Sequence, residues 1–226
     1  MRQVDFGPRE RASSVSDQRK ETVAHGYDAL VDDYLEWSEQ IRDATRQRLV
    51  QEFMARLPPR GAVLDLGCGA GIPSTRLLVQ RFAVTGVDIS GAQIEAARRN
   101  VPHATFLQAD VATLELPDGS FDGVTAFFSV IHVPREEHAR LFARILRWLR
   151  PNGLFLASLA ANGGPDWTGE WLGQQMFFSS FDAATNRRLL RQAGFELLVD
   201  EVIQVQEPEG SVPFLWVLAR RPPADG

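Results

Sequence analysis

Short apolar runs alternate along the chain with longer segments in which apolar residues recur at helical spacing. Turn residues bound five of these runs, and each is predicted to be a strand: 62–66, 83–87, 105–108, 121–127 and 154–159. Helices are predicted at 74–82, at 91–100 and from Pro134 onward. Strands that alternate with helices are joined by right-handed crossovers, so these five strands should form a parallel sheet.

The last part of the chain follows a different pattern. A helix is predicted at 183–193, ended by Gly194. Two strands follow, 196–204 and 212–220, with a Pro-Glu-Gly turn and no helix between them, so they should pair as an antiparallel hairpin. We therefore predict an α/β fold with a doubly wound, Rossmann-like sheet of seven strands, mostly parallel, in which the last strand is antiparallel.

Before the first strand, residues 1–16 are polar and are predicted to form a loose arm. One helix is predicted to begin at a cap on Ser16 or Asp17 and to run to about Trp37. A second helix is predicted at about 41–57, because two prolines follow it.

The first predicted strand runs directly into a stretch with almost no side chains. Residues 63–71 read V-L-D-L-G-C-G-A-G, and Gly67, Gly69 and Gly71 permit positive φ and a close approach of backbone N–H groups to a ligand. Strand, glycine turn and helix are typical of a nucleotide-binding site at a helix N-terminus. A purely structural turn is the alternative.

An acidic residue ends the second predicted strand. Asp88 follows Gly67 by 21 residues, close to the spacing of about 20 at which a carboxylate binds ribose hydroxyls. The glycines follow G-x-G-x-G, and Ile72 occupies the position where a dinucleotide fingerprint has Gly or Ala. Asp65 suits a cationic ligand group, such as an amino-acid ammonium, better than two phosphates. A nicotinamide oxidoreductase is therefore disfavoured.

In order along the chain, residues 63–71, 86–90 (G-V-D-I-S) and 108–111 (Q-A-D-V) resemble the successive motifs of class I S-adenosylmethionine-dependent methyltransferases. The resemblance covers about residues 20–221. It implies S-adenosyl-L-methionine as cofactor and S-adenosyl-L-homocysteine as product. It also implies an N-terminal helical lid over the cofactor.

The resemblance assigns cofactor-binding roles to ten residues: Tyr27, Asp65, Gly67, Gly69, Gly71, Asp88, Ile89, Asp110, Val111 and Phe128. In the family, the position of Asp65 helps hold the cofactor ammonium, and that of Asp88 takes the ribose hydroxyls. Asp110 matches the acid that accepts the adenine amino hydrogens, and capping of the next turn is its alternative role. Tyr27 matches a tyrosine of the lid, and core packing is the alternative there.

The segment 160–181 is long for a connection between a strand and a helix, and it is rich in aromatic residues. We expect it to lie on the substrate side and to cover a small apolar or aromatic acceptor; a local core beneath the loop is the alternative. With two aromatic residues of the N-terminal helix, the candidate substrate residues are Tyr34, Trp37, Trp167, Trp171, Met176 and Phe177.

His132 is the one histidine near the carboxyl edge of the predicted sheet. A hydroxyl acceptor needs a base, and an imidazole has a suitable pKa. His132 is therefore the candidate catalytic residue, and packing of its loop is the alternative. No further residue is needed to activate the methyl group, because a sulfonium is already reactive; the acceptor has to be held in line with it.

Charge and composition narrow the partners. The net charge is −5 and no basic run stands out, so no nucleic acid or anionic membrane is expected. No apolar run is long enough to span a membrane, and no apolar segment near the start suggests a secretory leader. A single cysteine fits a reducing cytoplasm, and four scattered histidines suggest no metal site. We expect a cytoplasmic monomer or homodimer.

The predicted organisation is a flexible arm (1–16), N-terminal helices that cover the cofactor site (17–58) and a methyltransferase core (59–226). The predicted function is methyl transfer to a small-molecule acceptor, with the accepting atom (O, N, S or C) left open. The alternative is a protein of the same fold that binds the cofactor without transferring methyl, such as a cyclase or a regulator.

Overall fold

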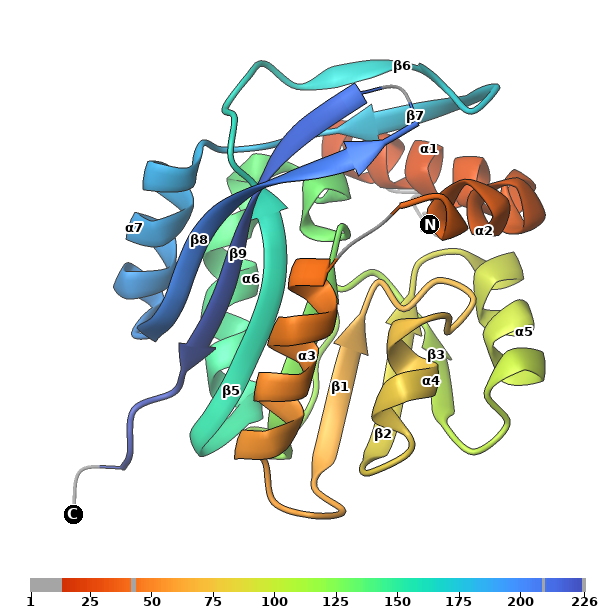
Figure 1. Cartoon of the computed structure of the whole chain (residues 1–226). Helices are drawn as coiled ribbons and strands as arrows, with labels where there is room; N and C mark the ends of the chain where they lie inside the picture. Colours follow the sequence, from red (N-terminus) through yellow and green to blue (C-terminus); the bar gives the residue numbers. More distant parts are fainter. Residues whose placement is uncertain (1–13, 42–43, 209, 225–226) are drawn as a thin grey trace, which may run out of the picture.

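A computed structural model of the chain describes residues 14–41, 44–208 and 210–224 (Figure 1). The helices are α1 (Val15–Ala29), α2 (Val31–Glu39), α3 (Ala44–Arg56), α4 (Ser74–Leu78), α5 (Gly91–Asn100), α6 (Arg135–Trp148) and α7 (Ala183–Ala193), with a short 3₁₀ helix η1 (Val130–His132). The strands are β1 (Ala62–Leu66), β2 (Ala83–Asp88), β3 (Thr105–Gln108), β4 (Phe121–Phe127), β5 (Leu149–Ala160), β6 (Trp167–Trp171), β7 (Gln174–Phe178), β8 (Glu196–Glu207) and β9 (Gly210–Arg220).

Seven strands form one sheet in the order β3-β2-β1-β4-β5-β9-β8. The pairs from β3 to β5 are parallel, and β9 runs antiparallel to both of its neighbours. The predicted doubly wound sheet with a reversed last strand is confirmed. Because the strand order reverses between β1 and β4, the carboxyl ends of these strands open a crevice there, where ligands bind in sheets of this kind.

Alternate residues of each central strand face opposite layers of helices. Leu64 and Leu66 of β1 join a buried core with α6 and α7, whereas Val63 packs with α3 and α4 on the other face. Trp148 of α6 and Trp216 of β9 are fully buried, one in each layer. Burial on both faces explains why these strands read as continuous apolar runs.

The N-terminal helix differs from the prediction because it is broken at Leu30, where φ is −110° and ψ is 18°. The Leu30 side chain is 1% exposed and packs with Val23 and with residues of β7, so the chain turns to bury it. The cap is Ser14, whose side chain accepts from the Asp17 N–H while the Asp17 carboxylate accepts from the Ser14 N–H. Residues 15 and 16 of the predicted arm are therefore helical; residues 1–13 lie outside the described part.

The predicted lid at 17–58 is also divided. α1 and α2 lie above the carboxyl ends of β1, β2 and β3 (Figure 1), whereas α3 packs flat against the sheet through Phe53 and its neighbours. Only the start of α3 reaches the crevice.

The segment 160–181 is not an open loop, since β6 and β7 pair as an antiparallel hairpin. Its turn is Leu172-Gly173, with φ of 50° and 78°, and two positive φ values mark the tight turn that suits a two-residue hairpin. A leucine at the first turn position hid this hairpin from prediction. The hairpin lies across α1 (Figure 1), and Met176 approaches Gly26 so closely that a Cβ there would lie 2.7 Å from its methyl carbon.

Within the described part of the chain, we find no helix of the length and apolar character needed to cross a bilayer.

Candidate functional site

The glycine turn after β1 has the backbone that its sequence predicts. Gly67, Gly69 and Gly71 have φ of 69°, 52° and 77°. A Cβ on Gly67 would lie 2.2 Å from the Cβ of Ser129, whereas a Cβ on Gly69 would meet no atom closer than 3.7 Å. Gly71 packs on α5, within contact of Val101 and Ala97. The first and third glycines are needed for packing, and the second leaves open space at the end of the strand.

Asp88 lies at the centre of this edge. Its carboxylate accepts the Gly69 N–H at 2.8 Å and the Ser90 N–H at 3.0 Å, which ties the glycine turn to the start of α5. Burial raises the pKa of Asp88, and these backbone hydrogen bonds oppose that effect. The carboxylate is fixed in place with acceptor capacity left over.

Asp65 is deeper in the fold. Thr75 and Thr125 donate their hydroxyls to its two oxygens at 2.5 and 2.7 Å. Burial raises the pKa of Asp65, and among the described residues no cation pairs with it. It borders a small cavity together with Gly67, Gly69 and Phe128. A buried carboxylate with only hydroxyl donors suits a ligand cation.

A first large cavity, about 670 Å³ of open space, lies between α1 and the carboxyl ends of β1 to β4. It gathers residues of all three predicted motifs: Gly67, Gly69, Asp88, Ile89, Asp110 and Val111. Lys20, Val23, Tyr27, Tyr34, Gln93, Phe127, Phe128, Ser129, His132 and Val133 complete its lining.

A second cavity, about 980 Å³ of open space, lies beside the first and is largely aromatic. Its rings come from distant segments: Tyr27, Tyr34, Trp37, Phe128, Trp171, Phe178 and Phe214. The rings of Trp37 and Trp171 meet edge to face with centroids 5.2 Å apart. Among the described lining residues, Arg46 is the only cation and Glu207 the only carboxylate. Such a lining fits an apolar or aromatic body with a few polar groups.

Four side chains border both cavities: Tyr27, Tyr34, Phe128 and His132. The Tyr27 hydroxyl lies 2.9 Å from His132 Nε2, and His132 Nδ1 lies 2.9 Å from the Phe177 carbonyl. A carbonyl only accepts, so Nδ1 carries the proton and Tyr27 donates to Nε2. Phe128 has φ of 52°, and its N–H donates to Ser158.

Burial governs the ionisation of this wall. It lowers the pKa of His132 to about 4, against a weaker opposing effect of the Phe177 carbonyl. Burial also raises the pKa of Tyr34 to about 12 and that of Tyr27 well above its usual value. At neutral pH the imidazole is therefore neutral and both phenols keep their protons.

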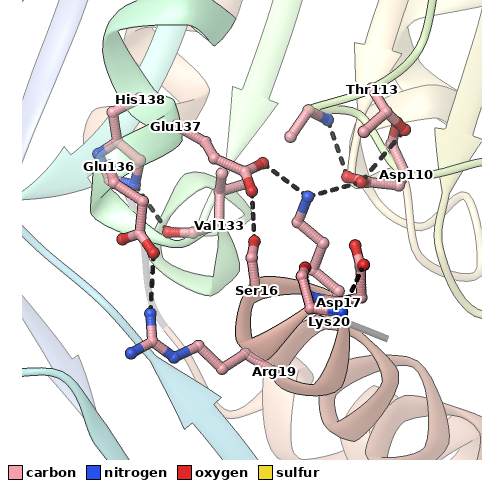
Figure 2. A network of polar contacts seen from close by, with 12 residues as sticks. Ser16, Asp17, Arg19, Lys20, Asp110, Thr113, Val133, Glu136, Glu137 and His138 are labelled. Atoms are coloured by element: carbon pink, nitrogen blue, oxygen red, sulfur yellow. Dashed lines mark hydrogen bonds and ion pairs between the residues drawn. The ribbon is translucent and has the colours of Figure 1, made fainter. Parts of the chain in front are cut away.

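Asp110 is held by the protein's own donors (Figure 2). Its carboxylate accepts the Ala112 N–H at 2.8 Å and the Thr113 hydroxyl at 3.2 Å, so the predicted capping role is present. Lys20 of α1 donates to the same group at 2.9 Å. Asp110 nevertheless lines the first cavity.

The predicted substrate residues divide into two groups. Tyr34, Trp37 and Trp171 line the second cavity. Met176 and Phe177 are buried beneath α1 and belong to a local core, while Trp167 is 46% exposed and its ring lies tilted against that of Phe178. The last three are not among the described residues that line either cavity. Trp167, Trp171 and Met176 share one face of the hairpin, because Trp167 pairs with Phe178 and Met176 with Gly169, so their positions along the hairpin decide which of them lines the cavity.

Several cavity residues were not predicted. Lys20 and Val23 lie at helical spacing on the same face of α1 as the predicted Tyr27, a signal that was available in the sequence. Gln93 is 1% exposed, and its carbonyl oxygen has no partner among the described residues. Arg46 and Glu207 reach the second cavity from α3 and the end of β8, and no sequence pattern links them. Cys68 is buried, which raises its thiol pKa, consistent with a packing role.

Comparison with known proteins agrees with this geometry. Residues 63–153 match a family model described as a methyltransferase domain. Residues 63–153 therefore form a methyltransferase domain of the class I, S-adenosylmethionine-dependent type. That family match contains the glycine turn, Asp88, Asp110 and His132.

The sequence similarity to individual relatives extends over only part of each protein. A trans-aconitate 2-methyltransferase from Variovorax paradoxus is 38% identical over 122 residues, which is 52% of this chain and 46% of that enzyme. An O-methyltransferase from Pyrenophora dematioidea is 30% identical over 174 residues, covering 71% of this chain and 64% of the other. The chain thus spans about half the length of the first of these relatives.

The fold extends further than the sequence similarity. The crystal structure of Burkholderia thailandensis 1,6-didemethyltoxoflavin-N1-methyltransferase, with bound 1,6-didemethyltoxoflavin and S-adenosylhomocysteine, superposes with a TM-score of 0.70. It is 22% identical, and the match covers 98% of each chain. The helices around the sheet are therefore part of a shared fold.

Proposed function

We propose that this chain transfers a methyl group from S-adenosylmethionine in the first cavity to a small molecule in the second. The observation that carries the proposal is the wall of four side chains shared by the two cavities. Two ligands bound there would meet at that wall. The relatives that act on small molecules support the same class of acceptor.

The residues of the first cavity fit the proposed cofactor. Asp88 keeps acceptor capacity beside its two backbone partners, and the Gln93 oxygen is a buried acceptor without a partner among the described residues. The two vicinal hydroxyls of a ribose would donate hydrogen bonds to these two acceptors. Asp65, buried without a cation among the described residues, suits the ammonium of the methionine portion.

The cofactor supplies an activated methyl group when bound, and the protein has only to hold the acceptor in line and exclude water. We propose that α1 and α2 act as the lid, since Tyr27 and Tyr34 border the cavities from above the sheet. The buried, uncharged wall keeps the transfer site dry.

The lining of the second cavity favours an acceptor with an aromatic or apolar body. One cation, Arg46, is too few among the described lining residues for a tricarboxylate such as trans-aconitate, and Glu207 adds a negative charge. The arrangement of rings fits a planar molecule better. The atom that is methylated stays open between oxygen, nitrogen, sulfur and carbon.

Within this proposal, His132 orients the Tyr27 hydroxyl at the wall. Its Nε2 is engaged by that hydroxyl, and a pKa of about 4 makes it a weak base. A hydroxyl acceptor would pass its proton to the Tyr27–His132 pair as the methyl group is transferred, whereas attack by a thiol or an electron-rich carbon depends less on a base.

The test has two stages. Calorimetric titration with S-adenosylhomocysteine should show micromolar binding that Asp88→Ala abolishes, and NAD serves as the control ligand. Incubation with labelled S-adenosylmethionine and a library of small aromatic acceptors should then give labelled product. Binding without transfer to any acceptor would favour the non-transferring alternative, and binding of NAD alone would overturn the proposal.

A further inference from the structure

A buried ammonium lies at one end of the proposed cofactor cavity. Lys20 is 6% exposed, and its Nζ lies 2.9 Å from Asp110 Oδ2 and 2.6 Å from Glu137 Oε2 (Figure 2). The three charged groups come from α1, the turn after β3 and the first turn of α6. Burial lowers the pKa of Lys20, but the hydrogen bonds that Lys20 donates to Asp110 and Glu137 outweigh this effect and raise the pKa overall. Lys20 is therefore a permanent cation.

The hydrogen bonds of Asp110 leave it limited capacity for a ligand. A carboxylate has about four acceptor positions. Oδ1 accepts from the Ala112 N–H, and Oδ2 accepts from Lys20 and, at 3.2 Å, from Thr113. About one position on Oδ1 remains for a donor from the cavity.

Lys20 also fixes which oxygen of Asp110 keeps that position. Its ammonium and the Thr113 hydroxyl hold Oδ2, so the free position lies on Oδ1. The same ammonium lies between Asp110 and Glu137, whose nearest oxygens are within about 6 Å of one another. Without it, the two carboxylates would repel each other and Asp110 would lose this orientation.

We propose that Lys20 is a specificity-determining positioning residue: by holding Asp110 Oδ2 it keeps the free acceptor position of this carboxylate on Oδ1, so that the cavity selects a purine with a 6-amino group over one with a 6-oxo group. The inference rests on the proposed function, because it concerns how that site recognises the base of its cofactor. Lys20 acts through Asp110 and not as a catalytic residue.

Two probes separate the amino from the oxo group: S-adenosylhomocysteine and its deaminated analogue S-inosylhomocysteine. The wild-type chain should bind the first about 100-fold more tightly, because a site that pairs with a donor rejects an acceptor in its place. Lys20→Met should reduce this ratio at least about tenfold, with circular dichroism and thermal unfolding to show that the variant is folded.

Two variants control for loss of α1 docking. Arg19→Met removes ion pairs of the neighbouring residue on α1 with Glu136 and Asp166, without touching Asp110. Glu137→Gln removes one partner of Lys20 and leaves the other. Both should keep the adenosyl-to-inosyl ratio within about threefold of wild type, since each leaves the Lys20–Asp110 pair in place.

A double-mutant cycle decides the route of the effect. If Lys20 acts through Asp110, Lys20→Met should change the ratio no further in an Asp110→Asn background. The inference would be overturned if Lys20→Met weakened the binding of both probes equally. It would also be overturned if Lys20→Met changed the affinity ratio as much in the Asp110→Asn background as in the wild-type chain. If the wild-type chain binds neither probe, the proposed function itself fails, which is a different result from lost selectivity.

Discussion

The two cavities share a wall of four residues but are built in different ways. The first is shaped by backbone: glycines with positive φ, N–H groups that donate to Asp88, and short polar side chains at strand ends. The second is shaped by rings that reach inward from α2, η1, β6, β7 and β9. Backbone geometry tolerates little change, whereas the rings can be exchanged without altering the strands that carry them. The first cavity is therefore suited to a fixed cofactor and the second to an acceptor that varies between related proteins.

The largest expected effect is on the backbone of the first cavity. Gly67→Ala would place a Cβ 2.2 Å from Ser129 at a φ of 69°. We expect a loss of about 3 kcal/mol in the free energy of unfolding, together with loss of cofactor binding. Urea unfolding measures the first and calorimetry the second.

Gly119→Ala is the matched control, because Gly119 has a φ of 64° but a Cβ there meets no atom within 4 Å. Gly119→Ala should lower the free energy of unfolding by only about 1 kcal/mol, because only the left-handed backbone is unfavourable for alanine there. Equal losses in the two variants would show that contact with Ser129 does not shape the turn.

Next in size is the removal of one charge from the same cavity. Asp88→Asn should weaken S-adenosylhomocysteine binding about 100-fold, since hydrogen bonds to a charged acceptor are lost in a buried site. Asp122→Asn is the control: Asp122 also accepts a backbone N–H, from Ala62 at 2.8 Å, but is not among the described residues of the cavity. Unchanged affinity in Asp88→Asn would remove this residue from the site.

The shared wall makes a prediction about pH. The pKa of His132 is about 4 in the folded chain and near 6.5 unfolded, so the unfolded chain binds more protons between these values and stability falls as pH falls. Between pH 7 and pH 5, the free energy of unfolding of the wild-type chain should fall by about 2 kcal/mol more than that of His132→Gln. Urea unfolding at both values checks this, and identical pH dependence in the two proteins would place His132 in a wetter setting.

The smallest effect should come from the rings of the second cavity. Trp171→Ala should raise KM for an identified acceptor about tenfold, from loss of part of a buried aromatic contact, and leave S-adenosylhomocysteine affinity unchanged. Trp167→Ala on the same hairpin should change neither, since Trp167 is 46% exposed and is not among the described lining residues. Similar KM values for both variants would contradict the division between these two tryptophans.

Local rules were sufficient wherever neighbouring residues decide the conformation. The bounds of β1, α5, β3, β4 and α7 agree with their patterns, because apolar runs, caps and turn residues lie next to one another in the sequence. The antiparallel pairing of β8 with β9 followed from the missing helix between these two strands. The hairpin β6–β7 and the break at Leu30 were missed, because burial against α1 overrides weak local signals in both.

The sequence by itself determined the sheet, the glycine turn and the carboxylates near the carboxyl ends of β1, β2 and β3. These lie within a few residues of strand ends, and parallel strands bring their ends to one edge. Only the tertiary structure decided that Lys20 reaches Asp110, that Tyr27 meets His132, and that Trp171 lines a cavity while Met176 fills a core. Lys20 and Asp110 are 90 residues apart, and Tyr27 and His132 are 105 residues apart. Trp171 and Met176 share one face of the hairpin, so their surroundings differ only through the elements that pack against it. No local preference encodes such contacts, because they exist only once the helices have packed on the sheet.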